Sequence, residues 1–299
     1  MAQAQTMNDG VNLSFALKDG ENKLGAEVIG LDLTKPIEDA CFAKLEDAFN
    51  NCSVLVFRNQ KITPEQHIDF SRRFGGLAVH VMEQYLLPGY PEIFRVSNVV
   101  EDGKRIGGSG EFWHTDLSYV EQPSRGSLLY AVEVPRDANG RSLGDTVFAN
   151  MAEAYNGLSD TTKKKIDNLK AVHRYGDVYK KVLKDRGGTV ELNDDQKKKV
   201  PDVIHPVVHI HPFTKQKSLF VNEGFTAEIV GIPKDESDEL LNELFEHCRR
   251  SEFHYRHVWE ENDLVMWDNW ATQHRGTGGY TSDHRRMMYR TTLEPTVQF

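Results

Sequence analysis

The chain contains one stretch that decides its interpretation, Glu111-Phe112-Trp113-His114-Thr115-Asp116-Leu117-Ser118-Tyr119. Its aromatic, β-prone character predicts a strand or the exit from one. Residues two apart on a strand point to the same face, so His114 and Asp116 are expected to converge while Thr115 turns away. An imidazole beside a carboxylate supplies two-thirds of the 2-His-1-carboxylate triad that holds non-haem Fe(II) and leaves open positions opposite. Because His-x-Asp alone more often marks a surface pair, the metal hypothesis needs a third ligand.

The candidate for that ligand is His274, which ends a second cluster, Trp267-Asp268-Asn269-Trp270-Ala271-Thr272-Gln273-His274. Arg285, Arg286 and Arg290 follow it. A histidine shortly before arginines suits a metal whose cosubstrate is a dicarboxylate. The metal would chelate one end of that molecule, and a planar guanidinium would grip the other end bidentately.

Composition excludes several classes of protein. The 299 residues are 39% hydrophobic, which indicates a globular chain, and the formal net charge of -9 argues against a broad nucleic-acid interface. The three cysteines are scattered, so neither a disulfide framework nor a thiolate zinc site is expected. No apolar run has membrane-spanning length, and the polar N-terminus lacks the core of a signal peptide. A cytoplasmic location without membrane contact is therefore expected.

Short strands outnumber helices along the chain, which predicts a mainly β fold with flanking helices and a double-stranded β-helix (jelly-roll or cupin-like) core. Since no repeat or linker divides the chain, residues 1–299 are expected to form a single domain. We expect a flexible tail over 1–12, a mobile loop at the site's mouth over 101–110, and a lid or insert over 177–202. Helices are predicted over 36–50, from a capping box at Thr63 to Gly75 or Gly76, and over 236–248. Strands are predicted over 24–33, 53–57, 93–98, 127–134, 145–149, 206–211, 218–222, 264–267 and 287–292.

Taken together, these motifs resemble the TauD/TfdA family of Fe(II)- and 2-oxoglutarate-dependent oxygenases. The resemblance runs from Gly25 to the strand that contains Arg290. Its strongest parts are Trp113 to Asp116, Gly144 to Thr146, Phe220 to Thr226, and Trp267 through His274 to Arg290. It implies an enzyme that uses Fe(II), 2-oxoglutarate and O2, hydroxylates a small anionic substrate, and forms succinate and CO2. It implies no nucleic-acid partner, and we expect a homo-oligomer, either a dimer or a tetramer.

The resemblance also implies roles for individual residues. The iron ligands would be His114, Asp116 and His274. Arg286 would anchor the distal carboxylate of 2-oxoglutarate, with the hydroxyl of Thr146 beside it. The substrate would be bound by Arg290, His80 and Phe225, with Tyr85 close by. His80 could equally be a satisfied polar residue, because a single histidine carries little motif information.

Departures from the family pattern bear on the substrate. Gly110 and Glu83 stand where taurine-oxidising members carry an asparagine and a tyrosine. A buried arginine is costly without a counter-anion, so Arg290 predicts a substrate with a sulfonate, sulfate or carboxylate group. A sulfonate is the first expectation, and an aryloxyalkanoate, another carboxylate or an alkyl sulfate is the alternative. A metal-dependent ligand-binding jelly roll without turnover is the non-enzymatic alternative.

Several nearby residues have structural interpretations. His209 and His211 are expected to pack or to donate hydrogen bonds, since no carboxylate partner is evident for them. Trp267 and Trp270 are expected in the core. Arg285, next to Arg286, is expected to face solvent, and Gly144 needs only a tight turn to explain it.

Overall fold

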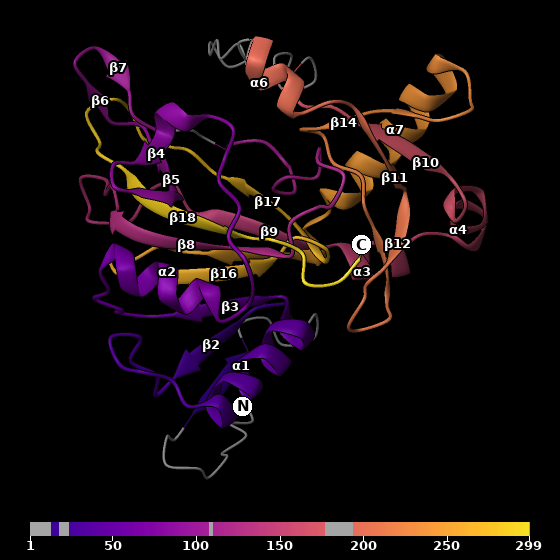
Figure 1. Ribbon diagram of the computed structural model, residues 1–299. Helices are drawn as coiled ribbons and strands as arrows, with labels where there is room; N and C mark the ends of the chain where they lie inside the picture. Colours follow the sequence, from indigo (N-terminus) through magenta and orange to yellow (C-terminus); the bar gives the residue numbers. More distant parts are fainter. Residues whose placement is uncertain (1–12, 18–23, 108–109, 177–193, 299) are drawn as a thin grey trace.

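Two β-sheets packed face to face form the jelly-roll core of the computed structural model (Figure 1). The structure describes residues 13–17, 24–107, 110–176 and 194–298. The predicted tail over 1–12 and residues 177–193 of the predicted lid lie outside the described residues. The mainly β architecture agrees with the sequence-based prediction.

The larger sheet has the order β1-β2-β3-β16-β8-β18-β5-β4, and the smaller one has the order β15-β9-β17. All pairs are antiparallel except β2 and β3, which run parallel. The larger sheet comprises β1 (Ser14–Leu17), β2 (Ala26–Ile29), β3 (Val54–Phe57), β16 (Leu264–Asp268), β8 (Gly126–Glu133), β18 (Met287–Leu293), β5 (Tyr90–Ser97) and β4 (Leu86–Leu87). The smaller sheet comprises β15 (His254–His257), β9 (Thr146–Asn150) and β17 (Thr272–Gly276).

Helices and short sheets cover the two outer faces of this sandwich. One face is covered by α1 (Asp39–Cys52) and α2 (Pro64–Arg72). The other carries α3 (Met151–Asn156), α4 (Asp160–Ile166), α7 (Lys234–Cys248) and, nearby, α6 (Asp194–Lys199). It also carries β10 (Lys170–His173), β11 (Val203–Pro206), β12 (Val208–Ile210), β13 (Lys217–Leu219) and β14 (Thr226–Ile229). No helix in the part of the chain that the structure describes is both long and apolar enough to span a bilayer.

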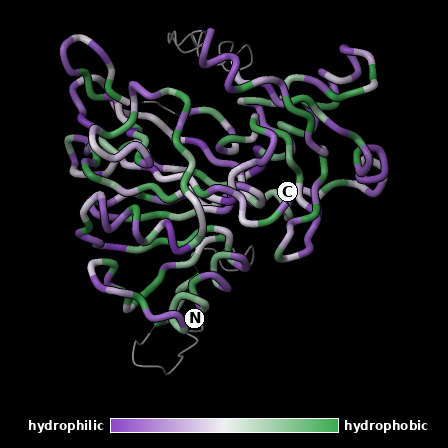
Figure 2. The backbone as a smooth tube through the Cα atoms, in the orientation of Figure 1, coloured by the Kyte–Doolittle hydropathy of each residue, from purple (hydrophilic) through white to green (hydrophobic). Residues whose placement is uncertain are grey.

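The central strands divide their side chains between two cores. In β3, Val54 and Val56 face the smaller sheet, whereas Leu55 and Phe57 face α1 and α2. This follows from the two-residue period of a strand, and all four side chains are buried because both faces are covered. Each such side chain stabilises the fold by about 1.5–3 kcal/mol. Figure 2 shows the resulting concentration of hydrophobic residues along the inner strands, while the exposed α6 is hydrophilic.

Local capping signals are confirmed where the structure tests them. The Thr63 hydroxyl accepts from the main-chain N–H of Gln66, and the Gln66 side chain accepts in return from the Thr63 N–H, which completes the capping box. Asn150 and Ser159 cap α3 and α4 with their side chains, which accept from main-chain N–H groups of the first turn. The helix that begins after Thr63 ends at Arg72, which is earlier than the predicted glycine end.

Two predictions of local structure were wrong. The charged segment expected as a mobile loop over 101–110 begins with a hairpin of β6 (Val100–Glu101) and β7 (Lys104–Arg105). Its turn residues Asp102 and Gly103 have φ values of 48° and 72°, and Asp-Gly is a strong signal for such a turn. The stretch 111–119 is irregular rather than a strand: only His114 makes a β-bridge, and Leu117 has a left-handed φ of 53°.

Two buried histidines give a prediction about stability and pH. Burial lowers the pKa of His67 and of His173 to about 3, and Nδ1 of each ring has no hydrogen-bond partner among the described residues. Below pH 6.5 the unfolded chain therefore binds protons that the native state does not bind. We expect each histidine to remove up to about 1.4 kcal/mol from the free energy of unfolding per pH unit as the pH falls from about 6.5.

The measurement is urea denaturation at several pH values between 7.5 and 5, above the range in which carboxylates titrate. His173→Gln should lose less stability over this interval than the wild type. An identical slope in the two proteins would contradict the assignment.

Candidate metal centre and cosubstrate cavity

The two candidate histidine ligands are brought together by their own main chains. The His114 N–H donates to the His274 carbonyl at 3.1 Å, and the His274 N–H donates to the His114 carbonyl at 2.9 Å. This reciprocal pair, made between β17 and an otherwise irregular segment, places the two side chains next to each other. Their ring centroids lie 4.2 Å apart.

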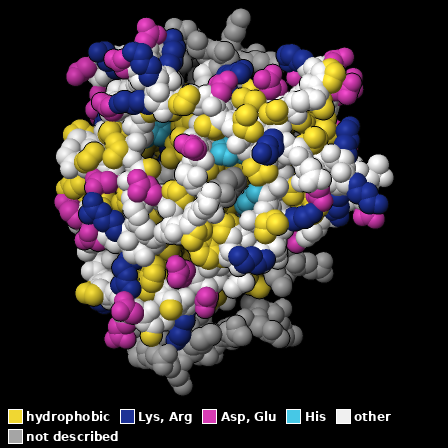
Figure 3. Space-filling model, turned by 45° about the vertical axis from the view of Figure 1, so that its right-hand side comes forward, with side chains coloured by type: hydrophobic (Ala, Val, Ile, Leu, Met, Phe, Trp, Pro, Cys, Tyr) yellow, Lys and Arg dark blue, Asp and Glu magenta, His cyan; other side chains and the backbone are white. Residues whose placement is uncertain are grey.

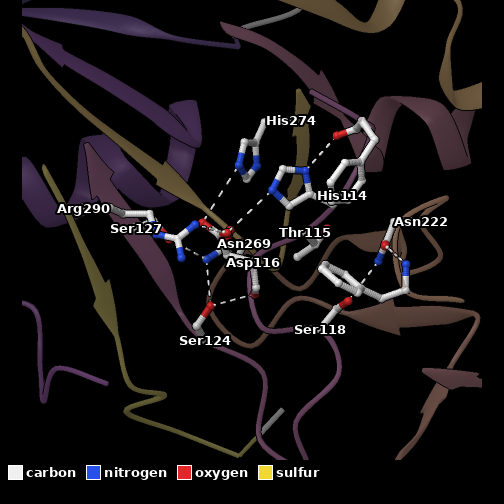
Figure 4. Close-up of polar contacts among 12 residues, drawn as sticks. His114, Thr115, Asp116, Ser118, Ser124, Ser127, Asn222, Asn269, His274 and Arg290 are labelled. Atoms are coloured by element: carbon white, nitrogen blue, oxygen red, sulfur yellow. Dashed lines mark hydrogen bonds and ion pairs between the residues drawn. The ribbon is translucent and has the colours of Figure 1, made fainter. Parts of the chain in front are cut away.

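Asp116 completes the cluster from a turn that follows His114. Its Oδ1 lies 3.7 Å from His114 Nε2, and its Oδ2 lies 3.9 Å from His274 Nε2. One donor atom from each residue lies within 4.8 Å of the other two, and all three side chains are buried (Figure 4). The sequence-based prediction that these residues converge is therefore correct, although a turn rather than a strand aims the carboxylate.

The electrostatics of the cluster suit a divalent cation. Burial lowers the pKa of His114 and holds that of His274 well below its usual value, so both imidazoles are neutral. Burial by itself would raise the pKa of the Asp116 carboxyl, but Arg290, the two imidazoles and the Ser127 hydroxyl together lower that pKa and keep the carboxylate ionised. His114 Nδ1 lies 2.8 Å from the Phe112 carbonyl, so that bond fixes the ring and leaves Nε2 facing the cluster. Two neutral nitrogens and one carboxylate form the donor set of a facial triad.

Two glycines shape the slot that holds His114. A Cβ at Gly110 would lie 2.7 Å from His114 Cε1, and a Cβ at Gly224 would lie 3.1 Å from His114 Cβ and 2.4 Å from Phe112 Cε2. A side chain at Gly110 would therefore press on the imidazole, and one at Gly224 would press on the Phe112 ring beside it. Gly110, one of the departures from the family pattern, thus brings its main chain directly against the proposed ligand His114.

One cavity extends from the histidine pair to Arg286. Its lining includes His114, His274, Thr146, Arg286 and Arg290, with apolar walls from Phe94, Val96, Leu129 and Trp267. Arg286 is 5% exposed, and its Nη2 donates to the Gly144 carbonyl at 3.3 Å. The Thr146 hydroxyl accepts from Trp259 Nε1 at 3.0 Å, so its own proton remains available to a ligand. A cation and a hydroxyl donor therefore lie in the same cavity as His114 and His274.

A second cavity adjoins the first. It shares His114, Phe94 and Arg290 with the first cavity. Its remaining lining residues are Asp116 and a group of largely apolar or aromatic side chains, namely His80, Met82, Phe112, Leu117, Tyr119, Tyr175 and Phe225. His80 and Phe225, for which the family resemblance implies substrate contact, thus line the same cavity as Arg290. On the face of the molecule drawn in Figure 3, a few histidine side chains reach the surface among hydrophobic ones, and charged side chains of both signs surround them.

His80 is a neutral hydrogen-bonding group in this cavity. Burial, helped by the nearby Arg290, lowers its pKa to about 3. The Met82 N–H donates to His80 Nδ1 at 3.1 Å, so the ring proton is on Nε2, which lies 3.5 Å from the Tyr119 hydroxyl.

Two expectations about the substrate residues need correction. Arg290 already has a counter-anion in this structure, since its Nη1 pairs with Asp116 Oδ1 at 2.5 Å. Its burial alone therefore does not require a substrate anion. Tyr85 does not line either cavity; it is buried against Phe94, with ring centroids 5.9 Å apart. The Glu83 carboxylate pairs with Lys199 of α6 at 3.1 Å.

The residues given structural interpretations behave largely as expected. The Nε2–H of His209 donates to the Trp270 carbonyl, and Trp267 and Trp270 are both 1% exposed. Arg285 is exposed and pairs with Glu133. The expectation for His211 was partly wrong, because its Nε2 lies 2.9 Å from the buried Asp268 carboxylate, which also pairs with Arg125.

The sequence reasoning missed the polar residues that support the ligands. Ser127 donates to Asp116 Oδ2 at 2.7 Å, and Asn269 contacts Ser127 at 3.2 Å. A signal was present in each case. Ser127 shares the inward face of its strand with Leu129 and Ala131, where a hydroxyl is unusual. Asn269 lies within the quoted cluster that ends at His274.

Comparison with known proteins agrees with this geometry. Residues 16–292 match the family model described as taurine catabolism dioxygenase TauD, TfdA family. The chain is 33% identical over 284 residues to an alpha-ketoglutarate-dependent 2,4-dichlorophenoxyacetate dioxygenase of Cupriavidus pinatubonensis, covering 91% of this chain and 95% of that protein. It is 30% identical to an alpha-ketoglutarate-dependent sulfonate dioxygenase of Saccharomyces cerevisiae, covering 90% of this chain and 64% of that protein.

A solved structure is similar throughout. The crystal structure of AAD-2 in complex with Mn(II) and N-oxalylglycine has a TM-score of 0.77 and 32% sequence identity, and the match covers 95% of this chain and 98% of that one. The family match over most of the chain agrees with the buried His-Asp-His cluster and with the cavity that joins it to Arg286. The chain belongs to the TauD/TfdA family and is an Fe(II)- and 2-oxoglutarate-dependent dioxygenase.

Proposed function

We propose that the enzyme hydroxylates a small organic anion whose body is apolar or aromatic. The observation that carries this proposal is the lining of the cavity beside His114. Arg290 is the one cationic side chain among its described lining residues, and most of the others are apolar or aromatic. An anionic head on Arg290 would leave the rest of the substrate against Met82, Phe112 and Phe225.

We assign the iron to His114, Asp116 and His274, and the distal carboxylate of 2-oxoglutarate to Arg286 with Thr146. Bound iron supplies the oxidation chemistry, in which O2 converts 2-oxoglutarate to succinate and CO2 and one oxygen atom enters a substrate C–H bond. The protein's own part is to orient the two ligands. Arg286 and Thr146 fix one end of 2-oxoglutarate, while Arg290 and His80 hold the substrate in the second cavity.

The cavity favours an apolar anion over taurine. Apart from the proposed ligand Asp116, no acidic side chain lines it among the described residues, so an ammonium group would have no partner of its own. A larger cavity adjoins it through His80, Leu117 and Tyr119, and hydrophobic residues such as Val79, Val120 and Leu293 line much of that space. The chain is similar to a dioxygenase of an aryloxyacetate and to a dioxygenase of sulfonates, which supports either a carboxylate or a sulfonate as the anionic group of the substrate.

The test is a comparison of Arg290 variants on paired substrates. We expect Arg290→Ala to raise the KM for an aryloxyacetate or an aryl sulfonate strongly. The reason is that truncating one partner of a desolvated charge pair costs roughly 2–5 kcal/mol of binding free energy. Arg290→Lys should be intermediate, because it keeps the charge without the planar fork. The affinity for 2-oxoglutarate should change little. Succinate release with each acid and with its neutral alcohol analogue measures both effects.

Because Arg290 also contacts Asp116, the metal affinity of each variant must be measured alongside as a control. Equal turnover of acid and alcohol by the wild type would contradict the anionic substrate, as would undiminished acid turnover by Arg290→Ala.

Three further properties are proposals at this stage. We propose that residues 1–299 form one dioxygenase domain, that the enzyme is a cytoplasmic protein, and that it assembles as a dimer or tetramer. Light scattering coupled to size-exclusion chromatography tests the assembly, and a monomeric mass at micromolar concentration would contradict it.

A further inference from the structure

A closed set of buried hydrogen bonds ends on Asp116 and begins at the turn between β16 and β17. Asn269 lies in this turn and is 1% exposed. Its Oδ1 accepts from Trp267 Nε1 at 2.9 Å, and its Nδ2 lies 2.7 Å from Ser124 Oγ and 3.2 Å from Ser127 Oγ. Because an indole N–H can only donate, the Trp267 contact identifies the amide oxygen. The amide N–H groups of Asn269 must therefore point to the two serines.

This orientation decides where the serine protons go. Each hydroxyl accepts from Asn269 and has one proton left to donate. Ser127 Oγ lies 2.7 Å from Asp116 Oδ2, and Ser124 Oγ lies 2.9 Å from the Asp116 carbonyl oxygen. Both of these oxygens only accept. Every bond in the network thus runs in one direction, from Trp267 through Asn269 and the serines to Asp116. Figure 4 shows Asn269, the two serines and Asp116.

Asp116 depends on such support because of where it lies. It belongs to a turn and has no strand partner, so no sheet ladder fixes its main chain. Ser124 holds its carbonyl and Ser127 holds one carboxylate oxygen, while Oδ1 faces Arg290. The two carboxylate oxygens are therefore in different environments, and the plane of the group is fixed.

From this geometry we infer that Asn269 and Ser127 are positioning residues that hold the Asp116 carboxylate in the orientation a divalent metal requires. The inference rests on the proposed role of Asp116 as a metal ligand. Asn269 acts on two ligands, because it supports Asp116 through the serines and lies in the turn that leads directly into β17 and His274. One side chain therefore ties the segment that carries His274 to the segment that carries Asp116. Outer partners of this kind typically change metal affinity 10–100-fold when they are removed.

The experiment measures Mn(II) binding to the full chain in the absence of 2-oxoglutarate and substrate, with free Mn(II) followed by electron paramagnetic resonance. We expect Ser127→Ala to weaken Mn(II) binding about 10–100-fold and Asn269→Ala to act in the same direction. Ser127→Ala should also alter the ligand-field absorption of the Co(II)-loaded protein. Thermal melts identify the variants that fold, and the two variants test the inference separately.

Thr115→Val is the matched control. The Thr115 hydroxyl is buried next to Asp116 in sequence and donates to the Thr272 carbonyl at 3.2 Å, but it does not contact the carboxylate. This variant loses a buried hydrogen bond between the same two segments. It should therefore lose stability while its Mn(II) affinity and Co(II) spectrum remain those of the wild type.

The outcomes separate this inference from the metal assignment. Wild-type Mn(II) affinity in a folded Ser127→Ala protein would overturn the positioning role while the metal site stands, as would an equal loss of affinity in Thr115→Val. A wild-type protein that does not bind Mn(II), or a His274→Ala variant that binds it normally, would overturn the metal site itself.

Discussion

His274→Ala is expected to abolish dioxygenase activity and to weaken Fe(II) binding by more than the 10–100-fold typical of an outer-shell change. A facial triad offers three protein ligands, so the loss of one leaves little redundancy. His114→Ala and Asp116→Ala should have the same effect, because each supplies one donor atom to the cluster. Anaerobic titration with Fe(II) and 2-oxoglutarate, followed through the metal-to-ligand charge-transfer band, measures binding, and succinate release measures turnover.

The control for this experiment is another fully buried histidine, His173, which lies outside the cluster. His173→Gln should keep the charge-transfer band and its activity near pH 7.5. If His274→Ala showed wild-type turnover and an intact band, the ligand assignment would be wrong.

The second large effect is expected at Arg286. Removing one partner of a desolvated charge pair costs roughly 2–5 kcal/mol, which corresponds to about a 30-fold to several-thousand-fold weaker binding of 2-oxoglutarate. Arg286→Ala should therefore raise the concentration of 2-oxoglutarate needed for half-maximal activity far more than that of iron. Thr146→Val should act in the same direction with a smaller effect, since it removes one neutral hydrogen bond.

The neighbouring arginine provides the matched control. Arg285 carries the same charge one position earlier, but it is exposed and paired with Glu133. Arg285→Ala should leave the 2-oxoglutarate titration unchanged. An unchanged titration in Arg286→Ala would refute the proposed anchor.

The fold class could be predicted because its cause is local. Apolar runs such as 53–57 and 264–267 are long enough for strands, and Thr63 has the residues of a capping box. The hairpin at Asp102 and Gly103 also has a local signal, since Asp-Gly is typical of a tight hairpin turn. The charged, glycine-rich composition of the segment favoured a loop instead. The order of strands in the larger sheet depends on pairings between distant segments, which no local pattern reveals.

The residues of the candidate site likewise fall into those that a local pattern reveals and those that depend on distant pairings. The residue types at His114 and Asp116 allowed their convergence to be predicted, although the strand that the prediction assumed is a turn. Arg286 could be predicted from its place after His274. The contact between Arg290 and Asp116 could not be predicted in this way, because β18 must first lie beside β8. Tyr85 shows the opposite error, since closeness in sequence to a pocket position does not place a side chain in the pocket. Ser127 and Asn269 depend on a turn and a strand that meet only in the folded chain.

His114 and His274 are 160 positions apart (274 minus 114), yet each supplies the main-chain partner of the other. A nascent chain that has emerged only as far as α7 thus has two of the three ligands but lacks the strand that aligns them. Closing a loop of this size costs conformational entropy, which the contacts across it must offset. The complete set of three proposed iron ligands therefore exists only in a chain that extends past His274. A chain truncated before β17 would keep His114 and Asp116 but lack both the third ligand and the main-chain partner of His114.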